Sequence, residues 1–328
     1  QSAQDVLAVL TSTENALTGL AGGGSMNSVN FSTALHRIGR HSFRDDTRAA
    51  ALKDPRFALF MCSLAEAVSG LDHTKSIKTI QEELEKGTST LVVPGENSIK
   101  FKPREWSNIA WAIAKLRLAP PNNAFPLDTS EEVVGDLVEA SFQLRSQVLE
   151  AARLRKQGKL TTDSPWVATL SKVSGLLMDS ISHTILTTTK NFNSQEWANL
   201  LWAMATAGRT DEDVSKRVTT NLLHSMTAMQ KDGILPKPQE ISNSIWALAT
   251  AGFNSESGAL MMLTADLLDT KEEYLAQFKP QELSNTAWGI ATILSNKRAS
   301  SDVERDSGKD DAVALRILRH IARSISEH

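Results

Sequence analysis

Four segments of the 328-residue chain repeat the frame Asn-x-x-Trp, and this repeat limits the possible folds more than any other feature of the sequence. The four pairs are Asn108 and Trp111, Asn199 and Trp202, Asn243 and Trp246, and Asn285 and Trp288. Their tryptophans are 91, 44 and 42 residues apart, so the first interval is close to two periods. Six of the seven tryptophans lie in these copies, whereas the chain has only one tyrosine. Copies at such a period indicate an array of helical repeats.

Each copy has the start and stop signals of an amphipathic helix. A glutamate follows two residues after Pro103, Ser194, Pro238 or Pro280, which places a favourable charge in a first helical turn. Gly208 and Gly252 follow the last apolar turn, where a C-terminal cap is expected. Second amphipathic runs cover residues 211–230, 257–277 and 310–326. We therefore predict an all-α fold, an α-solenoid of helix–turn–helix repeats of about 40–44 residues each.

The same pattern predicts how the chain is divided. We expect residues 1–25 to be a flexible segment with a Gly-rich linker, and residues 26–100 to hold divergent repeats. A faint copy there has Phe31 and His36 at the two tryptophan positions. We expect a solenoid over residues 101–328, with insertions near 130–160 and 295–309. Two helical runs, 131–156 and 165–189, are predicted between the first and second clear copies, and residues 88–97 are expected to form an irregular loop.

Composition excludes several classes of protein. Lys and Arg number 35 against 38 Asp and Glu, a formal charge of −3, so no global basic field attracts nucleic acid. The single cysteine, Cys62, excludes a disulfide framework and multi-cysteine metal sites. No run approaches about 18 uninterrupted apolar residues, so we expect no membrane span. The chain starts at Gln1 and not at methionine, which suggests that a targeting segment has been removed.

Signatures of catalysis are missing from the sequence. The run Gly22-Gly23-Gly24 lacks the Lys-Ser/Thr of a phosphate loop, and the seven histidines form no metal-binding motif. Cys62 lies in an apolar run and is expected to be a core residue, and the acids at 211–213 are expected to mark a helix start. We therefore predict no enzyme activity, no cofactor, no metal site and no small-molecule substrate.

The repeated Asn-Trp stripe has two interpretations. It is an RNA surface if the asparagine amides bond to base edges and the tryptophan rings stack on unpaired bases. It is an internal ladder if tryptophan fills the space between repeats and asparagine satisfies backbone groups of the next unit. We favour the second interpretation for the tryptophans, because a residue that is identical in every unit cannot discriminate between bases.

A base-reading code needs positions that vary between repeats. The first turn carries Arg104 in one copy and glutamine in the others, and the residue after the asparagine is Ile109, Leu200, Ser244 or Thr286. Readers that recognise one base per repeat use two or three side chains in each unit. The candidate RNA-binding residues are therefore Gln195, Gln239, Gln281, Ser244 and Thr286, supported by the amides of Asn199, Asn243 and Asn285.

Local basic clusters are candidates for contacts with phosphate. The candidates are Arg37, Arg40 and Arg44 in the N-terminal section, and Arg155 and Lys156 at the end of the inserted helix. Phosphate neutralisation by these residues predicts strongly salt-dependent binding. Each cluster, like the C-terminal Arg316, Arg319 and Arg323, can instead be an ordinary solvated helix face.

The frame Pro-x-Glu-Trp/Leu-x-Asn-x-x-Trp, as at Pro103-REWSNIAWAIA and Pro280-QELSNTAWGIA, resembles the octotricopeptide repeat family. It is also similar to the helical repeats of RAP-domain and FAST-kinase-like organelle proteins. The resemblance covers roughly residues 101–294. It implies an α-solenoid in a chloroplast or mitochondrion, of which we favour the chloroplast, that binds single-stranded organellar RNA and governs its maturation, stability or translation.

Two functions of different classes follow. The first is an organellar RNA-binding repeat protein. The alternative is a protein-binding scaffold of a larger organellar assembly, such as a ribosome or a membrane-protein complex, because helical solenoids serve both uses.

Overall fold

A computed structural model describes residues 2–12, 27–42, 44–70, 99–120, 130–159, 164–187, 192–209, 211–253, 257–271, 273–299 and 307–326. These described residues form thirteen α-helices, one short 3₁₀ helix and no strand, which confirms the predicted all-α class. The helices divide into two compact units, residues 1–187 and 188–328. The division falls inside the segment 101–328 that the sequence groups together.

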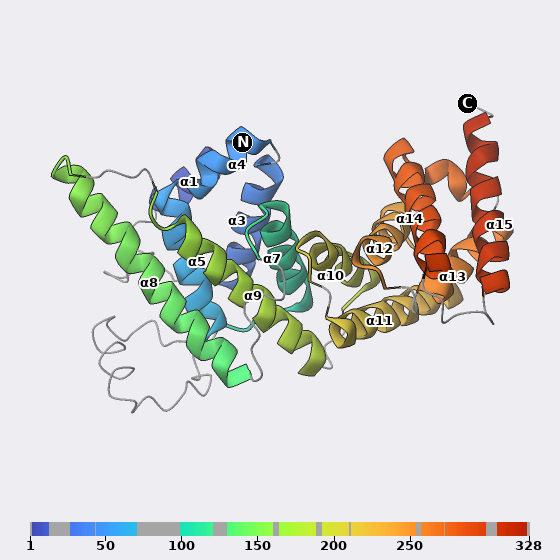
Figure 1. Ribbon diagram of the computed structural model, residues 1–328, viewed down its shortest axis with the longest axis horizontal. Coiled ribbons are helices and arrows are strands. Elements are labelled where there is room, and N and C mark those ends of the chain that lie inside the picture. The colour runs from blue at the N-terminus through green and yellow to red at the C-terminus, as the bar shows by residue number, and fades with distance from the viewer. Residues whose placement is uncertain are drawn as a thin grey trace. The chain divides into compact units, whose positions relative to one another are not determined.

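The first unit pairs the faint copy with the first clear copy. Its helices are α1 (Ala3–Ser12), α3 (Ser28–His41), α4 (Asp45–Leu52), α5 (Pro55–Val68), α7 (Pro103–Lys115), α8 (Ser130–Lys156) and α9 (Val167–Thr187). Helix α3 packs along α7, while α5, α8 and α9 pack against one another and α9 also meets α7 (Figure 1). The two helical runs predicted between the first and second clear copies are thus α8 and α9, and α8 lies over α5 and α9.

In the second unit, the helices that carry the Asn-x-x-Trp copies stack on one another. Its helices are α10 (Ser194–Thr206), α11 (Glu212–Lys231), α12 (Pro238–Ala251), α13 (Ser257–Thr270), the 3₁₀ helix η2 (Leu275–Gln277), α14 (Pro280–Ala299) and α15 (Ser307–Ser326). Helix α12 packs between α10 and α14, which carry the other two copies (Figure 1). Helix α11 packs against α10, α13 against α12, and α15 against α13 and α14. The unit is therefore repeat-like, with the copies in adjacent helices.

The copies start in the same register because each glutamate closes a cap. The Glu105, Glu196 and Glu282 carboxylates accept the backbone N–H three residues earlier, at 2.6, 2.8 and 2.8 Å. Asn193 completes a reciprocal box, since its Oδ1 accepts the backbone N–H of Glu196 at 2.9 Å. The sequence assigns these glutamates only a favourable charge, whereas the structure also gives them hydrogen bonds that fix where each helix begins.

The predicted C-terminal caps are confirmed. Gly208 and Gly252 have φ values of 68° and 77°, in the left-handed region that glycine enters without strain. Arg117 takes the same position in the first copy with φ 53°, a conformation that costs a residue with a Cβ about 1–2 kcal/mol.

One predicted boundary is wrong. Helix α13 ends at Thr270, not at residue 277, and the chain then turns so that the buried Tyr274 hydroxyl donates to the Pro236 carbonyl at 2.6 Å. In the insertion predicted near 295–309, residues 295–299 are helical, because α14 continues to Ala299, and Arg298 pairs with Asp311 of α15. The predicted linker at 21–25 and the loop at 88–97 lie outside the described residues.

Candidate functional site

In the two copies that carry both tryptophans, the two tryptophan positions have different surroundings. Trp106 and Trp197, in the first turns of α7 and α10, are only 7% and 5% exposed. Their rings pack on the preceding Phe101 and Phe192 at centroid distances of 4.9 and 4.4 Å. The first position is therefore a core position, and its role is to anchor the start of the helix.

The second position forms a row of rings at the surface, which we call the tryptophan ladder: Trp202, Trp246 and Trp288. Its neighbouring ring centroids are 6.3 and 6.4 Å apart, and the ring planes are inclined by 31° and 33°. Trp288 is 48% exposed, and Trp202 and Trp246 are partly exposed. The ladder thus combines features of both sequence interpretations, because its rings contact one another across the repeats and are also open to solvent.

Polar amides flank the ladder on the same helix faces. Asn199, Asn243 and Asn285, one turn before each ring, are partly exposed, and their side chains have no hydrogen-bond partner among the described residues. The predicted backbone-satisfying role of these amides is therefore not seen in this part of the chain. Gln195, Gln239 and Gln281, a further turn back, are exposed. The Gln195 carbonyl accepts the Lys237 ammonium at 3.0 Å.

The residue after the asparagine of each copy, which the sequence also predicts to recognise bases, faces the core. Ser244 and Thr286 are 0% and 1% exposed, and their hydroxyls donate to the Glu240 and Glu282 carbonyls at 2.6 and 2.8 Å. Their equivalents Ile109 and Leu200 are fully buried as well. Base reading needs an exposed hydroxyl, so neither Ser244 nor Thr286 fits the contact that the sequence suggested. Sequence variation at this position reflects packing between neighbouring helices.

The equivalent surface of the first unit is basic. His36 of α3 lies against Trp111 of α7, with ring centroids 4.6 Å apart, and the faint copy is therefore in register with the clear one. Arg40 and Arg104 are exposed on the same two helices. Partial burial, and then the charges of these two arginines, lower the pKa of His36. Lys115 of α7 occupies the register position of Arg40, so this surface carries three cationic side chains.

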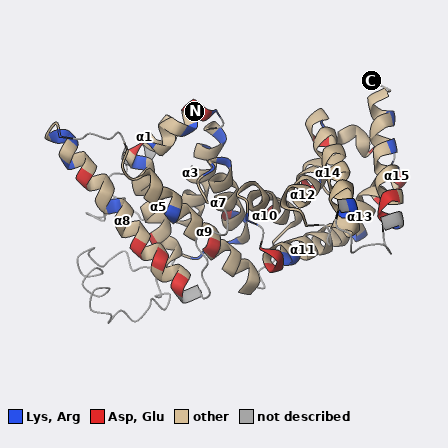
Figure 2. Cartoon of the chain, viewed as in Figure 1, with Lys and Arg blue, Asp and Glu red and all other residues tan. Residues whose placement is uncertain are grey.

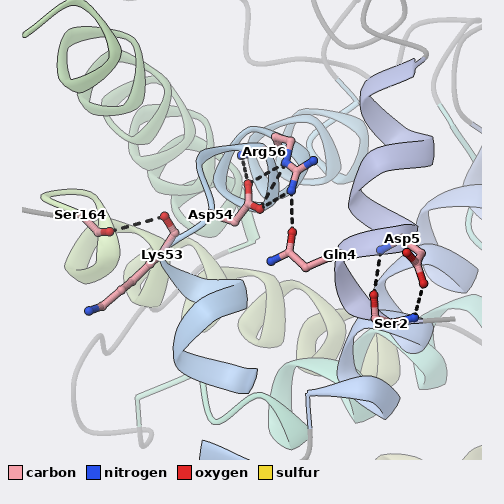
Figure 3. Close-up of polar contacts among 7 residues, drawn as sticks. All are labelled: Ser2, Gln4, Asp5, Lys53, Asp54, Arg56 and Ser164. Carbon is pink, nitrogen blue, oxygen red and sulfur yellow. Dashed lines mark hydrogen bonds and ion pairs between the residues drawn. The ribbon is translucent and has the colours of Figure 1, made fainter. Parts of the chain in front are cut away.

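The N-terminal basic residues differ in their exposure and in their ion pairs. Arg37, Arg40 and Arg44 are exposed. Arg48 pairs with Asp45 at 2.5 Å. Arg56 pairs with Asp54 at 2.6 Å and donates to the Gln4 side chain at 2.6 Å, as Figure 3 shows. The sequence did not single out Arg104 and Lys115 as phosphate contacts. The sequence could have indicated them, because they occupy the same repeat positions as the exposed stripe residues of the other copies.

Basic residues also lie at the C-terminal end of α8, which is blue in Figure 2. Arg155 and Lys156 are exposed at the C-terminal end of α8, while Arg145 of the same helix is taken up by Glu66 of α5 at 2.5 Å. On α15, Arg316 pairs with Asp266 and Asp269 of α13. Arg316 therefore contributes to the packing of α15 against α13.

Groups with catalytic chemistry are few in the described part of the chain. Cys62 is fully buried in α5, as predicted, and burial raises the pKa of its thiol to about 12. Asp211 caps α11 by accepting the Val214 N–H at 2.9 Å, which confirms that the acids at 211–213 mark a helix start. Among the described residues, no group of three or more His, Cys, Asp or Glu is placed to hold a metal ion.

Membrane-spanning segments were sought in the same residues. None of the described helices combines the length and the apolar character that crossing a bilayer requires.

Comparison of the chain with models of protein families, with curated proteins and with solved structures found no match.

Proposed function

We propose that this protein is an α-solenoid of the octotricopeptide type that binds single-stranded RNA. The observation that carries the proposal is the tryptophan ladder, three at least partly exposed rings on the helices of three consecutive copies, with the asparagine amides beside them. A partly exposed row of aromatic rings offers a stacking surface for unpaired bases, each worth about 1–3 kcal/mol.

The amides suit the same ligand. A carboxamide carries two donors and one acceptor group, so it pairs with the edge of any base that presents complementary atoms. Asn243 and Asn285 lie one turn before their rings, and Gln239 and Gln281 lie one turn further back. A base resting on a ring of the ladder would meet these amides along its edge.

Phosphate attraction in the proposal comes from the first unit. Arg37, Arg40, Arg104 and Lys115 lie on α3 and α7, which are equivalent to the ladder helices. The whole chain has a charge of −3, so binding would depend on this local surface and not on the net field. The resemblance to organellar repeat proteins extends the proposal to a chloroplast RNA and its maturation, stability or translation.

A protein-binding scaffold is the second candidate, and the surface of α15 favours it. Leu315 and Ile325 are 51% and 65% exposed, and with Leu318 they follow helical spacing along one face. An exposed apolar stripe on one helix is a feature of protein-docking surfaces.

Titration of the full chain with a labelled single-stranded RNA, followed by fluorescence anisotropy, tests the proposal. We expect binding at micromolar protein that weakens steeply between about 50 and 200 mM salt, while a duplex of the same sequence binds more weakly. Equal affinity for the duplex would contradict the proposed preference for single strands, and an absence of salt-dependent binding would contradict RNA binding. A protein complex that copurifies under the second outcome would support the scaffold.

A further inference from the structure

Each copy of the frame in the second unit packs on the copy before it. Helix α12 packs on α10, and α14 packs on α12 (Figure 1). Four positions are buried in both α10 and α12, namely the residues five, four and one before the second tryptophan and the third residue after it. We call these positions the repeat-contact side. Their eight residues are at most 7% exposed: Trp197, Ala198, Leu201, Ala205, Ile241, Ser242, Ile245 and Ala249.

The repeat-contact side of α14 is open. Ser284 and Ala291 are exposed, and Leu283 and Ala287 are partly exposed. Helix α14 packs against α12 and α15, and these contacts leave the four positions accessible. Three of the four residues are apolar, whereas an array of helical repeats normally ends on a polar outer face. The open side of α14 therefore resembles an internal contact between copies and not the end of an array.

The contacts between copies show what kind of helix this side accepts. A Cβ added to Gly289, one residue after its tryptophan, would lie 2.8 Å from Cγ2 and 3.1 Å from the carbonyl oxygen of Ile245, a residue of the repeat-contact side of α12. In the first unit, Ala112 of α7 holds the place of Gly289. It lies against Gly39, which belongs to the repeat-contact side of α3, within 3.3 Å of a Cβ added there. In both contacts, a helix with glycine or alanine at this place approaches the previous copy closely.

A hydrogen bond between copies adds a polar requirement. The Lys237 ammonium, just before α12, donates to the side-chain carbonyl of Gln195 on α10 at 3.0 Å. Gln281 holds the position of Gln195 on α14 and is exposed. Lysine and proline also begin α7 and α14. A helix that begins in the same way and packs on α14 would therefore bring its lysine to Gln281.

A second copy of this chain is poorly suited to this side. Within one chain, the small residues at the place of Gly289 are already buried: Ala112, Ala203, Ala247 and Gly289. Helix α3 is different, because it has the exposed Arg37 at this place. A long charged side chain keeps two backbones apart, so α3 of another copy cannot repeat the close approach. The occupant that fits is a helix from a different protein.

We propose that the repeat-contact side of α14 docks a helical hairpin of another protein, built in the register of the copies described above. The docking helix has alanine or glycine where α14 has Gly289, so that its backbone reaches Ala287 and Ala291. It begins with lysine and proline, which places an ammonium at Gln281. This contact goes beyond RNA binding and does not depend on it, because none of the four positions belongs to the tryptophan ladder.

An appended hairpin tests this assignment in the full chain. The probe is a second copy of residues 232–270, which hold the α12–α13 hairpin and the linker before it, joined after His328. Ala291→Cys is expected to react with a maleimide in the unextended chain, since position 291 is exposed and Cys62 is fully buried. The extension is expected to slow this reaction at least about tenfold, as a docked population above about 90% would, and to raise the melting temperature. Thr220→Cys, exposed on α11, is the control and should react equally fast in both chains.

Two further variants test the chemistry of the contact. Ala247→Arg in the appended hairpin alone is expected to restore the fast reaction at position 291. Ala287→Arg in the unextended chain should leave the melting temperature unchanged, because this position is partly exposed, and in the extended chain it should abolish the gain. A reaction rate that the extension leaves unchanged, or protection that persists with Ala247→Arg, would overturn the proposal.

Sedimentation velocity of the wild-type chain separates the two possible occupants. A monomer at micromolar concentration is the expected result. A dimer that Ala287→Arg converts to a monomer would overturn docking of another protein in favour of self-association. None of these measurements uses RNA, so their outcome is independent of the RNA titration above.

Discussion

The two units carry the same repeat register with different chemistry on its exposed face. In the first unit, the His36–Trp111 ring pair is accompanied by Arg40, Arg104 and Lys115. In the second unit, the rings of the tryptophan ladder have glutamine and asparagine at the preceding turns and threonine after them. The same register thus carries a basic surface in the first unit and an aromatic surface with amide side chains in the second. The comparison shows that the register determines where side chains lie, and that residue choice within the register determines whether the exposed face is basic or aromatic.

The largest expected effect tests whether the two tryptophan positions differ as described. Trp197→Ala removes a ring that is 5% exposed and should lower the free energy of unfolding by about 3–5 kcal/mol. Trp288→Ala removes a ring that is 48% exposed and should cost about 1 kcal/mol or less. Chemical denaturation measures both. Equal losses would mean that the ladder is a core feature.

The second prediction concerns the caps, which both units share. Glu240→Ala removes the acceptor of the Ser194 hydroxyl and of the Lys237 backbone N–H, and should cost about 1–3 kcal/mol. Glu105→Ala, in the first unit, should cost about as much, because it removes the acceptor of the Lys102 backbone N–H. Glu212→Ala, at an exposed position after the cap of α11, is the matched control and should be near neutral. A control as damaging as the cap variants would contradict this account of the shared register.

The sequence predicted the repeat frame, the C-terminal glycine caps and the core role of Cys62, because these follow from local periodicity and turn chemistry. It could not place Ser244 and Thr286, since a hydroxyl can be buried at low cost when it bonds to the carbonyl four residues earlier. It also could not separate the buried Trp197 from the exposed Trp288. Their exposure depends on which neighbouring helix covers each position, which is a tertiary property.

The third prediction tests the charge difference between the two units. Arg40→Gln combined with Arg104→Gln should weaken binding to all single-stranded RNA sequences alike. Each lost phosphate contact should reduce the slope of log affinity against log salt by about 0.7. The pair Lys216→Gln and Lys231→Gln, exposed on α11, removes the same charge and serves as control. An equal change in slope for both pairs would mean that net charge, and not the α3–α7 surface, attracts the ligand.

The smallest expected effect concerns pH. The pKa of His36 in the folded chain lies below its ordinary value of 6.5, because of burial and then the charges of Arg40 and Arg104. Just below pH 6.5 the unfolded chain therefore binds a proton at this position that the folded chain does not, and stability falls as the pH falls through that range. Above pH 6.5 this contribution is constant.

His36→Gln should remove that loss, so the wild type should lose more stability than the variant between pH 7 and the folded-state pKa. Thermal unfolding across this range measures the difference, and His224→Gln, exposed on α11, is the control. Identical pH profiles for the wild type and His36→Gln would contradict a pKa of His36 that burial and the two arginines lower.

The most direct test of the central claim compares a single-stranded RNA with an abasic strand of the same length, titrated against the wild type, the Arg40→Gln/Arg104→Gln variant and Trp246→Leu. The account predicts that the arginine variant loses affinity for both strands, while Trp246→Leu loses affinity only for the strand that carries bases. Affinity for both strands that Trp246→Leu leaves unchanged, or that it lowers equally, would contradict a division of phosphate and base contacts between the two surfaces.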